Sequence, residues 1–171
     1  MPINSTTNQP MPKSENQTEA LYDVYTNMRS GEQAELRRGT PGEPFWRLLS
    51  SIGKADAHDD DLPKWQLIIQ CIAISGYSST RFGKALKQAG YSQARLKRLL
   101  EADDDMLDGI LRRTARQLKS ANQKANWNDI RRLLFDYKGK DAERMRLRIA
   151  QDYYTHDNIS NDTAQDDDTD A

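Results

Sequence analysis

Residues 64–75 read KWQLIIQCIAIS, the most apolar run of the sequence, and this stretch decides the fold class. Its apolar side chains occupy nearly all sides of a helix rather than one stripe, which is typical of a helix surrounded by other helices. A glycine follows at position 76, where a helix commonly ends. We therefore predict a buried central helix over residues 64–75.

The segments on either side of this run also have helical periodicity, and none contains a clear alternating run of strand length. Apolar stripes precede it at 21–28 and 45–52, and start and stop residues after it predict further helices. We expect N-caps at Thr18, Ser79 and Ser92, and an acidic helix start at 103–105. The predicted fold class is all-α: a compact helical bundle of seven or eight helices, or two small helical lobes. The later helices are expected over 79–90, 92–102, 105–120, 127–139 and 141–154.

The length of 171 residues fits one helical domain, which we place at 18–156. Residues 1–17 and the acidic residues 157–171 contain almost no apolar side chains, and we predict that both are disordered tails. The single cysteine, Cys71, lies in the apolar run and is expected to be a buried thiol, so no disulfide forms within the chain. With no membrane-spanning run and no signal peptide, we expect a cytoplasmic protein without a membrane partner.

Charge is distributed unevenly although the formal net charge is only −1. Residues 1–80 carry seven basic and ten acidic side chains, residues 81–148 carry eighteen and nine, and residues 149–171 carry seven acidic side chains alone. The predicted helices over 79–89, 92–102 and 105–120 separate apolar residues on one side from cations on the other. Consecutive cationic helices suit a surface that follows a phosphate backbone, and solvated faces are the alternative.

Motifs for catalysis are missing from the sequence. His58 and Asp59 resemble a metal-binding dyad, but only His156 remains as a further histidine. The acidic run 103–105 lacks the spacing of a calcium loop, and no glycine-rich phosphate loop is present. We predict that the protein is not an enzyme and binds no metal or cofactor. Trp127 and Tyr137 are expected in the core, whereas Phe135 lies off the apolar stripe and suits either a subunit interface or chance exposure.

Several segments together resemble a known family. They are GEQAELRR (31–38), PFWRLL (44–49), RFGKALKQAG (81–90), ARLKRLLEAD (94–103), LRR (111–113) and NWNDIRRLLFDY (126–137). In their order, spacing and chain length these segments resemble the CasB family, the small subunit of the type I-E CRISPR surveillance complex Cascade. The resemblance covers roughly residues 20–154.

The resemblance implies a noncatalytic, all-helical subunit of an RNA-guided complex. Its partners would be the guide RNA, both strands of the target DNA in the R-loop, other Cascade subunits and a second copy of itself. The family's basic positions are matched by Arg37, Arg38, Lys84, Arg95, Arg112, Arg113 and Arg132. Together with the charge map this gives the candidate nucleic-acid-binding residues Arg37, Arg38, Lys84, Arg95, Arg98, Arg112, Arg113, Arg116, Lys119, Arg131 and Arg132.

Two other function classes remain open at this point. The predicted helices 79–89 and 92–102, joined by a short turn, would suit a helix-turn-helix transcription regulator. A helical protein–protein adaptor without nucleic-acid contacts is the third class. For Arg37 and Arg38, pairing with Glu32 or Glu35 is the alternative to a binding role, and no role is assigned to Lys124.

Overall fold

The structure, a computed structural model, describes residues 17–155. In this range the chain forms nine α-helices and no strand, and the predicted all-α class is confirmed. The number exceeds the seven or eight expected, because α2 forms over the GEQAELRR segment, where no helix was predicted. The helices are α1 (Gln17–Thr26), α2 (Ser30–Arg38), α3 (Glu43–Ser51), α4 (Leu62–Ser75), α5 (Phe82–Gln88), α6 (Gln93–Glu101), α7 (Asp104–Ser120), α8 (Asn128–Phe135) and α9 (Lys140–Thr155).

Two helix starts follow the capping rules. The Ser92 side chain accepts a hydrogen bond from the Arg95 amide at the start of α6, and Asp103 accepts one from the Met106 amide at the start of α7. Each bond satisfies an amide that has no partner inside its helix.

The predicted start of α5 at Ser79 is wrong, since the helix begins at Phe82. The backbone before it is engaged with a distant segment: the Ser78 amide donates to the Ala125 carbonyl, and the Asn126 amide donates to the Thr80 carbonyl. An isolated parallel bridge joins Tyr77 to Ala125 in the same place. A helix cannot start while these backbone groups hold the chain extended.

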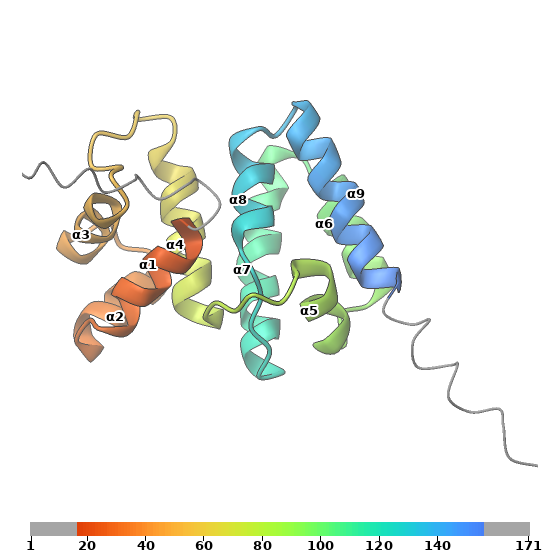
Figure 1. The fold of residues 1–171 in the computed structure, drawn as a ribbon, viewed down its shortest axis with the longest axis horizontal. Coiled ribbons are helices and arrows are strands. Elements are labelled where there is room, and N and C mark those ends of the chain that lie inside the picture. Colours follow the sequence, from red (N-terminus) through yellow and green to blue (C-terminus); the bar gives the residue numbers. More distant parts are fainter. Residues whose placement is uncertain (1–16, 156–171) are drawn as a thin grey trace, which may run out of the picture.

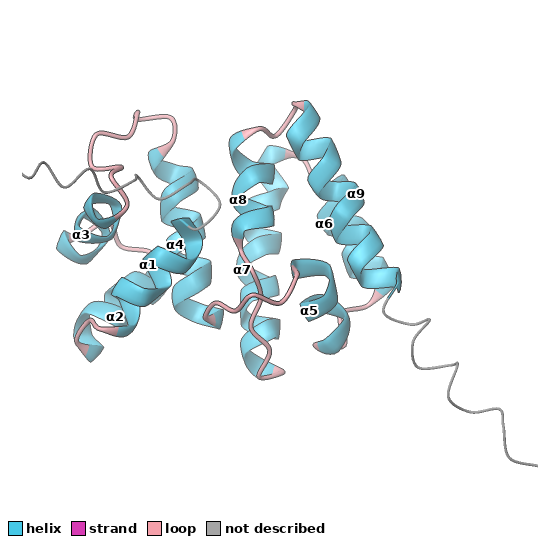
Figure 2. Cartoon of the chain, viewed as in Figure 1, coloured by secondary structure: helices cyan, strands magenta, loops and turns pink. Residues whose placement is uncertain are grey.

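The helices form two groups that share one core (Figure 1). Helices α1–α4 gather on one side and α5–α9 on the other, with short loops between most of them (Figure 2). The central helix α4 packs against α7 and α8 and so joins the groups. Its buried side chains, among them Ile68, Cys71 and Ile72, belong to a cluster of buried apolar residues that extends through both groups.

The aromatic residues of the α8 region pack inside the chain. Trp127 is fully buried, contacts Phe82 edge to face with ring centroids 5.0 Å apart, and donates a hydrogen bond from Nε1 to Ser75 Oγ. The Tyr137 ring is half-buried, and its hydroxyl donates to the Ala102 carbonyl at 2.7 Å. Phe135 is also half-buried, with its ring centroid 4.9 Å from that of Trp65.

Both predicted tails fall almost entirely outside the described residues, as does position 156. Gln17, which the sequence analysis assigned to the N-terminal tail, is the first residue of α1. Thr18 therefore lies inside α1 and is not its cap. None of the helices between residues 17 and 155 has both the length and the apolarity needed to cross a membrane.

Candidate nucleic-acid interface

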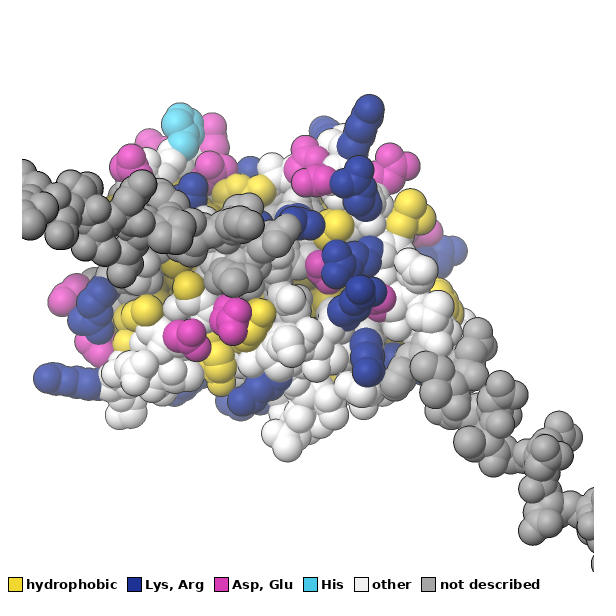
Figure 3. Space-filling model, viewed as in Figure 1, with side chains coloured by type: hydrophobic (Ala, Val, Ile, Leu, Met, Phe, Trp, Pro, Cys, Tyr) yellow, Lys and Arg dark blue, Asp and Glu magenta, His cyan; other side chains and the backbone are white. Residues whose placement is uncertain are grey.

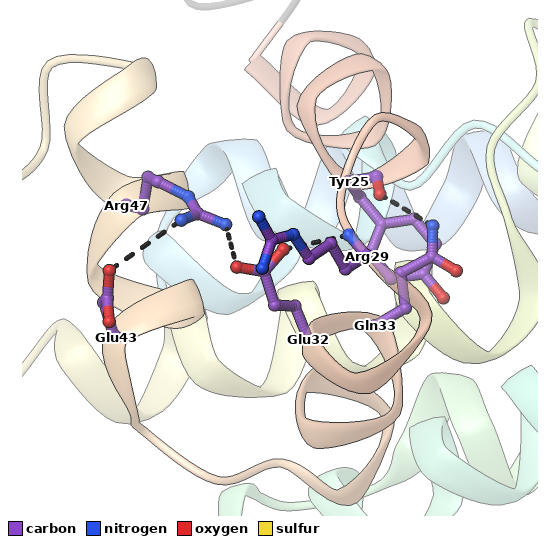
Figure 4. A network of polar contacts seen from close by, with 6 residues as sticks. All are labelled: Tyr25, Arg29, Glu32, Gln33, Glu43 and Arg47. Atoms are coloured by element: carbon purple, nitrogen blue, oxygen red, sulfur yellow. Dashed lines mark hydrogen bonds and ion pairs between the residues drawn. The ribbon is translucent and has the colours of Figure 1, made fainter.

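The acid at position 32 is not a partner of the α2 arginines. Figure 4 shows Glu32 reaching α3, where its carboxylate accepts a hydrogen bond from Arg47 at 2.6 Å, and it also accepts from the Arg29 amide at 2.9 Å. The bond from Arg47 is the main reason that the pKa of Glu32 is lowered. Within residues 17–155, neither Glu32 nor Glu35 forms an ion pair with Arg37 or Arg38.

The last turn of α2 meets α7 at one buried amide. Gln70 of α4 is 8% exposed. Its Nε2 donates to the Arg37 carbonyl at 3.1 Å, and its Oε1 accepts a hydrogen bond from Arg112 Nε at 2.8 Å. The Arg37 guanidinium turns toward α1 and donates to the Tyr25 hydroxyl. Because a single amide makes both bonds, the Arg112 side chain and the end of α2 lie next to each other.

Helix α7 presents a row of cations opposite its buried side. Leu107, Leu111 and Leu118 are buried, whereas Arg113, Arg116 and Lys119 are exposed. The sequence predicts this separation, because it follows from the helical repeat. Arg112 is half-buried and lies 4.0 Å from Asp108. Arg116 and Lys119 have no acidic partner in the described part of the chain.

A groove runs between α6 and α7 with arginines on its walls. It encloses ≈530 Å³ and is lined by Arg95, Arg98 and Arg113 together with Tyr91, Ile110, Thr114, Gln117 and Ser120. The Arg95 guanidinium donates to the Gln117 side chain across the groove, and Arg113 Nε donates to the Gly109 carbonyl of its own helix. A second hollow of ≈680 Å³ shares Arg98, Ile110 and Arg113 with the first. Among residues 17–155, no carboxylate pairs with any of the three arginines.

We call the candidate cations of α6 and α7 the α7 surface: Arg95, Arg98 and Arg113 line the groove, and Arg112, Arg116 and Lys119 lie on α7 itself. This surface holds six of the eleven candidate residues. Arg37 and Arg38 lie in the last turn of α2, whose Arg37 carbonyl is bound to the same Gln70 amide as Arg112.

The other three candidates lie on helices that pack against α9. Lys84 is exposed on α5, and Arg131 and Arg132 are half-buried on α8. Arg131 donates to the Asn128 side chain, and burial lowers its pKa. Figure 3 shows Lys and Arg side chains gathered over α8 and α9 with acidic side chains beside them. The structure thus divides the predicted cations between two regions.

Buried carboxylates neutralise much of the charge in the α8–α9 region. Asp129 and Asp152 are buried, and Arg81, Arg132 and Arg148 surround Asp129 closely enough to act on its pKa. Burial is the largest influence and raises the pKa of Asp129, and the attraction of Arg148 opposes it. Arg81 is bound to Asp152 at 2.9 Å. These cations hold the helices together, whereas those of the groove have no such partners among the residues that the structure describes.

Sequence reasoning missed the polar residues that orient the cations. Gln70 lies in the most apolar helix of the chain, and a glutamine in that setting was the available signal. Gln117 was hidden among ordinary residues of α7, and Tyr91 of the groove lies in the connection between α5 and α6. Lys124, which had no assigned role, contacts α1: its Nζ lies 3.3 Å from the Tyr22 hydroxyl and 5.6 Å from the centre of that ring.

The profile of the family described as CRISPR-associated protein Cse2 matches residues 32–154 of the chain. This match covers all the candidate residues. The chain belongs to the Cse2 family of CRISPR-associated proteins. The resemblance to CasB that the sequence showed is therefore confirmed, and this Cse2-family protein is a Cascade subunit with other Cascade subunits as partners.

A solved structure has the same fold as this Cse2-family chain. The crystal structure of M. ruber CasB aligns with a TM-score of 0.68 and 17% sequence identity, covering 87% of this chain and 98% of that one. At this identity the likeness concerns the fold. No curated protein sequence matches the chain.

Proposed function

We propose that this Cse2-family protein is a noncatalytic Cascade subunit that stabilises the guide RNA, the target strand and the displaced strand in the R-loop. Its α7 surface would bind their phosphate backbones. The observation that carries the proposal is the groove between α6 and α7, where Arg95, Arg98 and Arg113 line one hollow without an acidic partner in the described residues.

The chemistry of an RNA-guided complex calls for such a surface. Base pairing with the guide supplies the sequence specificity, so a subunit that holds the opened strands needs cations directed at the backbone rather than side chains that read bases. Exchange of a DNA duplex for an RNA–DNA duplex is nearly balanced in free energy, so a few additional protein contacts decide whether the R-loop persists. Arginine suits this role because its planar guanidinium binds phosphate through two hydrogen bonds.

The pairing of the cations supports the choice of the α7 surface. Arg47 and Arg81 bind Glu32 and Asp152, so recruiting them to phosphate would break contacts between helices. Arg98, Arg113 and Arg116 are exposed and form no ion pair within residues 17–155 that phosphate binding would break. Phosphate binding therefore costs the fold least at α6 and α7.

The chemistry of the remaining side chains favours a binding role. Cys71 is buried and its pKa is raised by burial to about 12, so it is a poor nucleophile at neutral pH. His58 is exposed and its nearest acidic partner is Asp60, at 3.4 Å. Family membership favours a Cascade subunit over a helix-turn-helix regulator. In addition, the cations Arg95 and Arg98 of α6 line a groove shared with α7.

The test is the double variant Arg98→Ala with Arg113→Ala in the full chain. Binding to single-stranded DNA of mixed sequence should weaken, and the slope of log affinity against log salt should become shallower by about 1.4, or about 0.7 for each lost phosphate contact. R-loop formation by the assembled complex should fall at least about tenfold, which corresponds to about 1.4 kcal/mol.

The matched control for this test is Lys97→Ala. Lys97 is exposed on α6 outside the groove and lies 4.0 Å from Glu101. Its removal should leave both the salt slope and R-loop formation nearly unchanged. Equal losses in the control and the double variant would show that general charge matters rather than the groove, and no loss in either would place the binding surface elsewhere.

A further inference from the structure

The buried amide of Gln70 connects the two groups of helices at the edge of the α7 surface. Its Oε1 accepts from Arg112 Nε at 2.8 Å and its Nε2 donates to the Arg37 carbonyl at 3.1 Å. The two bonds use the acceptor and one donor of the same side chain, which is only 8% exposed. An amide in this position satisfies a cation from α7 and a backbone carbonyl from α2 together, which no apolar or singly polar side chain can do.

Close packing holds this amide in one orientation. Gly39 ends α2 with a φ of +77°, and a Cβ atom there would lie 2.9 Å from Gln70 Cδ. One turn earlier on α4, Gln66 donates a hydrogen bond from Nε2 to the Gly39 carbonyl. The end of α2 therefore rests on two glutamines of α4, but only Gln70 also contacts Arg112.

The arginine that Gln70 holds keeps donors for another ligand. Nε is bound to Gln70, while the terminal nitrogen Nη2 lies only within 4.0 Å of Asp108, an exposed pair that contributes little to stability. The guanidinium side chain is 38% exposed. Its orientation is thus set from the buried side, and its terminal nitrogens remain near the solvent. A side chain that is ordered before binding loses less entropy when it binds phosphate.

We propose that Gln70 is a positioning residue that orients Arg112 against the last turn of α2, so that the guanidinium of Arg112 is held ready for phosphate at the junction of the two helix groups. This inference rests on the proposed function and adds to it a residue without charge and without contact to the nucleic acid. It also explains why a buried glutamine stands at position 70 of the apolar helix α4.

The experiment compares Gln70→Met with Gln66→Met in the full chain. Methionine has nearly the shape of glutamine but makes neither hydrogen bond. Gln70→Met should weaken binding to a labelled single-stranded DNA by about threefold to tenfold, the cost of ordering one long side chain on binding. Gln66→Met removes one bond to α2 without touching Arg112, so affinity and salt slope should stay as in the parent protein.

A double-mutant cycle with Arg112→Ala separates positioning from loss of structure. If Gln70 acts through Arg112, adding Gln70→Met to Arg112→Ala should cause no further loss of affinity and no further change in salt slope. An equal loss in both backgrounds, or equal effects of the two methionine variants, would overturn the inference while leaving the proposed function intact. Unchanged binding in Arg112→Ala would instead remove Arg112 from the proposed interface, and the inference with it.

Discussion

The guanidinium of Arg81 donates a hydrogen bond of 2.9 Å to the carboxylate of Asp152, although the two residues are 71 positions apart in the sequence. The Asp152 side chain is only 9% exposed, and Arg148 lies 4.0 Å from its other oxygen. The bond joins Arg81, the residue before α5, to α9. Because a buried carboxylate is costly without a partner, the two arginines and the acid depend on one another.

Replacing Asp152 with alanine should therefore destabilise the fold. We expect a loss of about 1–3 kcal/mol in the free energy of unfolding, since Arg81 loses its hydrogen-bond acceptor and the partly buried Arg148 loses the nearby negative charge. Chemical denaturation followed by circular dichroism measures it. The control Asp141→Ala removes an exposed pair with Arg144 on the same helix and should cost less than about 1 kcal/mol. Similar losses in the two variants would contradict a special role for the buried pair.

Gly83→Ala should be among the most damaging single changes. Helix α5 approaches α9 so closely there that a Cβ atom would collide with the Ile149 carbonyl oxygen and lie 2.9 Å from the Tyr153 amide nitrogen. Both are backbone atoms, so the helices must separate, at a cost of about 1–3 kcal/mol or more. Gly31→Ala is the matched change, because no atom lies within 4 Å of its Cβ position in α2, and it should leave stability equal or higher. The melting temperature should therefore fall in Gly83→Ala and stay equal or rise in Gly31→Ala, and a small effect at position 83 would contradict the close approach.

Asp129→Asn should change the pH dependence of stability. Burial raises the pKa of Asp129 above its ordinary value of 3.8, so the folded chain binds that proton more tightly than the unfolded chain. The resulting stabilisation is complete below pH 3.8 and is lost as the pH rises through the folded-state pKa.

The asparagine variant does not ionise, so its stability relative to the parent should increase as the pH rises from the acidic range to neutrality. Melting temperatures of both proteins across that range provide the measurement. A difference that does not vary with pH, or that changes in the other direction, would mean that attraction to Arg81, Arg132 and Arg148 outweighs burial.

Cys71 should not react in the folded protein. The thiol is 1% exposed, and burial raises its pKa to about 12, so neither access nor the thiolate form is available near neutral pH. A chromogenic disulfide reagent should label it only as the chain unfolds, with a denaturant midpoint equal to that seen by circular dichroism. Rapid labelling without denaturant would show that α4 opens locally.

Much of the helical architecture could be predicted because its causes are local. Ser92 and Asp103 cap helices by bonding to amides three residues away, and the apolar side of α7 follows from its own repeat. The start of α5 could not be predicted in this way. It depends on the hydrogen bond that the Ser78 amide donates to Ala125 and on the one that the Thr80 carbonyl accepts from Asn126, and the sequence alone does not bring these segments near each other.

The candidate site likewise has features that the sequence predicts and features that depend on the tertiary structure. The sequence determines which residues of α6 and α7 are cationic and which of these lie away from the core. Residue type gives the charge, and the helical period gives the side of the helix. Only the tertiary structure decided that Arg112 lies against Gln70, 42 positions earlier, that Arg81 is bound to Asp152, and that Arg95, Arg98 and Arg113 line one groove. Such contacts depend on the angles and offsets at which helices pack, and these are set by the whole core rather than by any one segment.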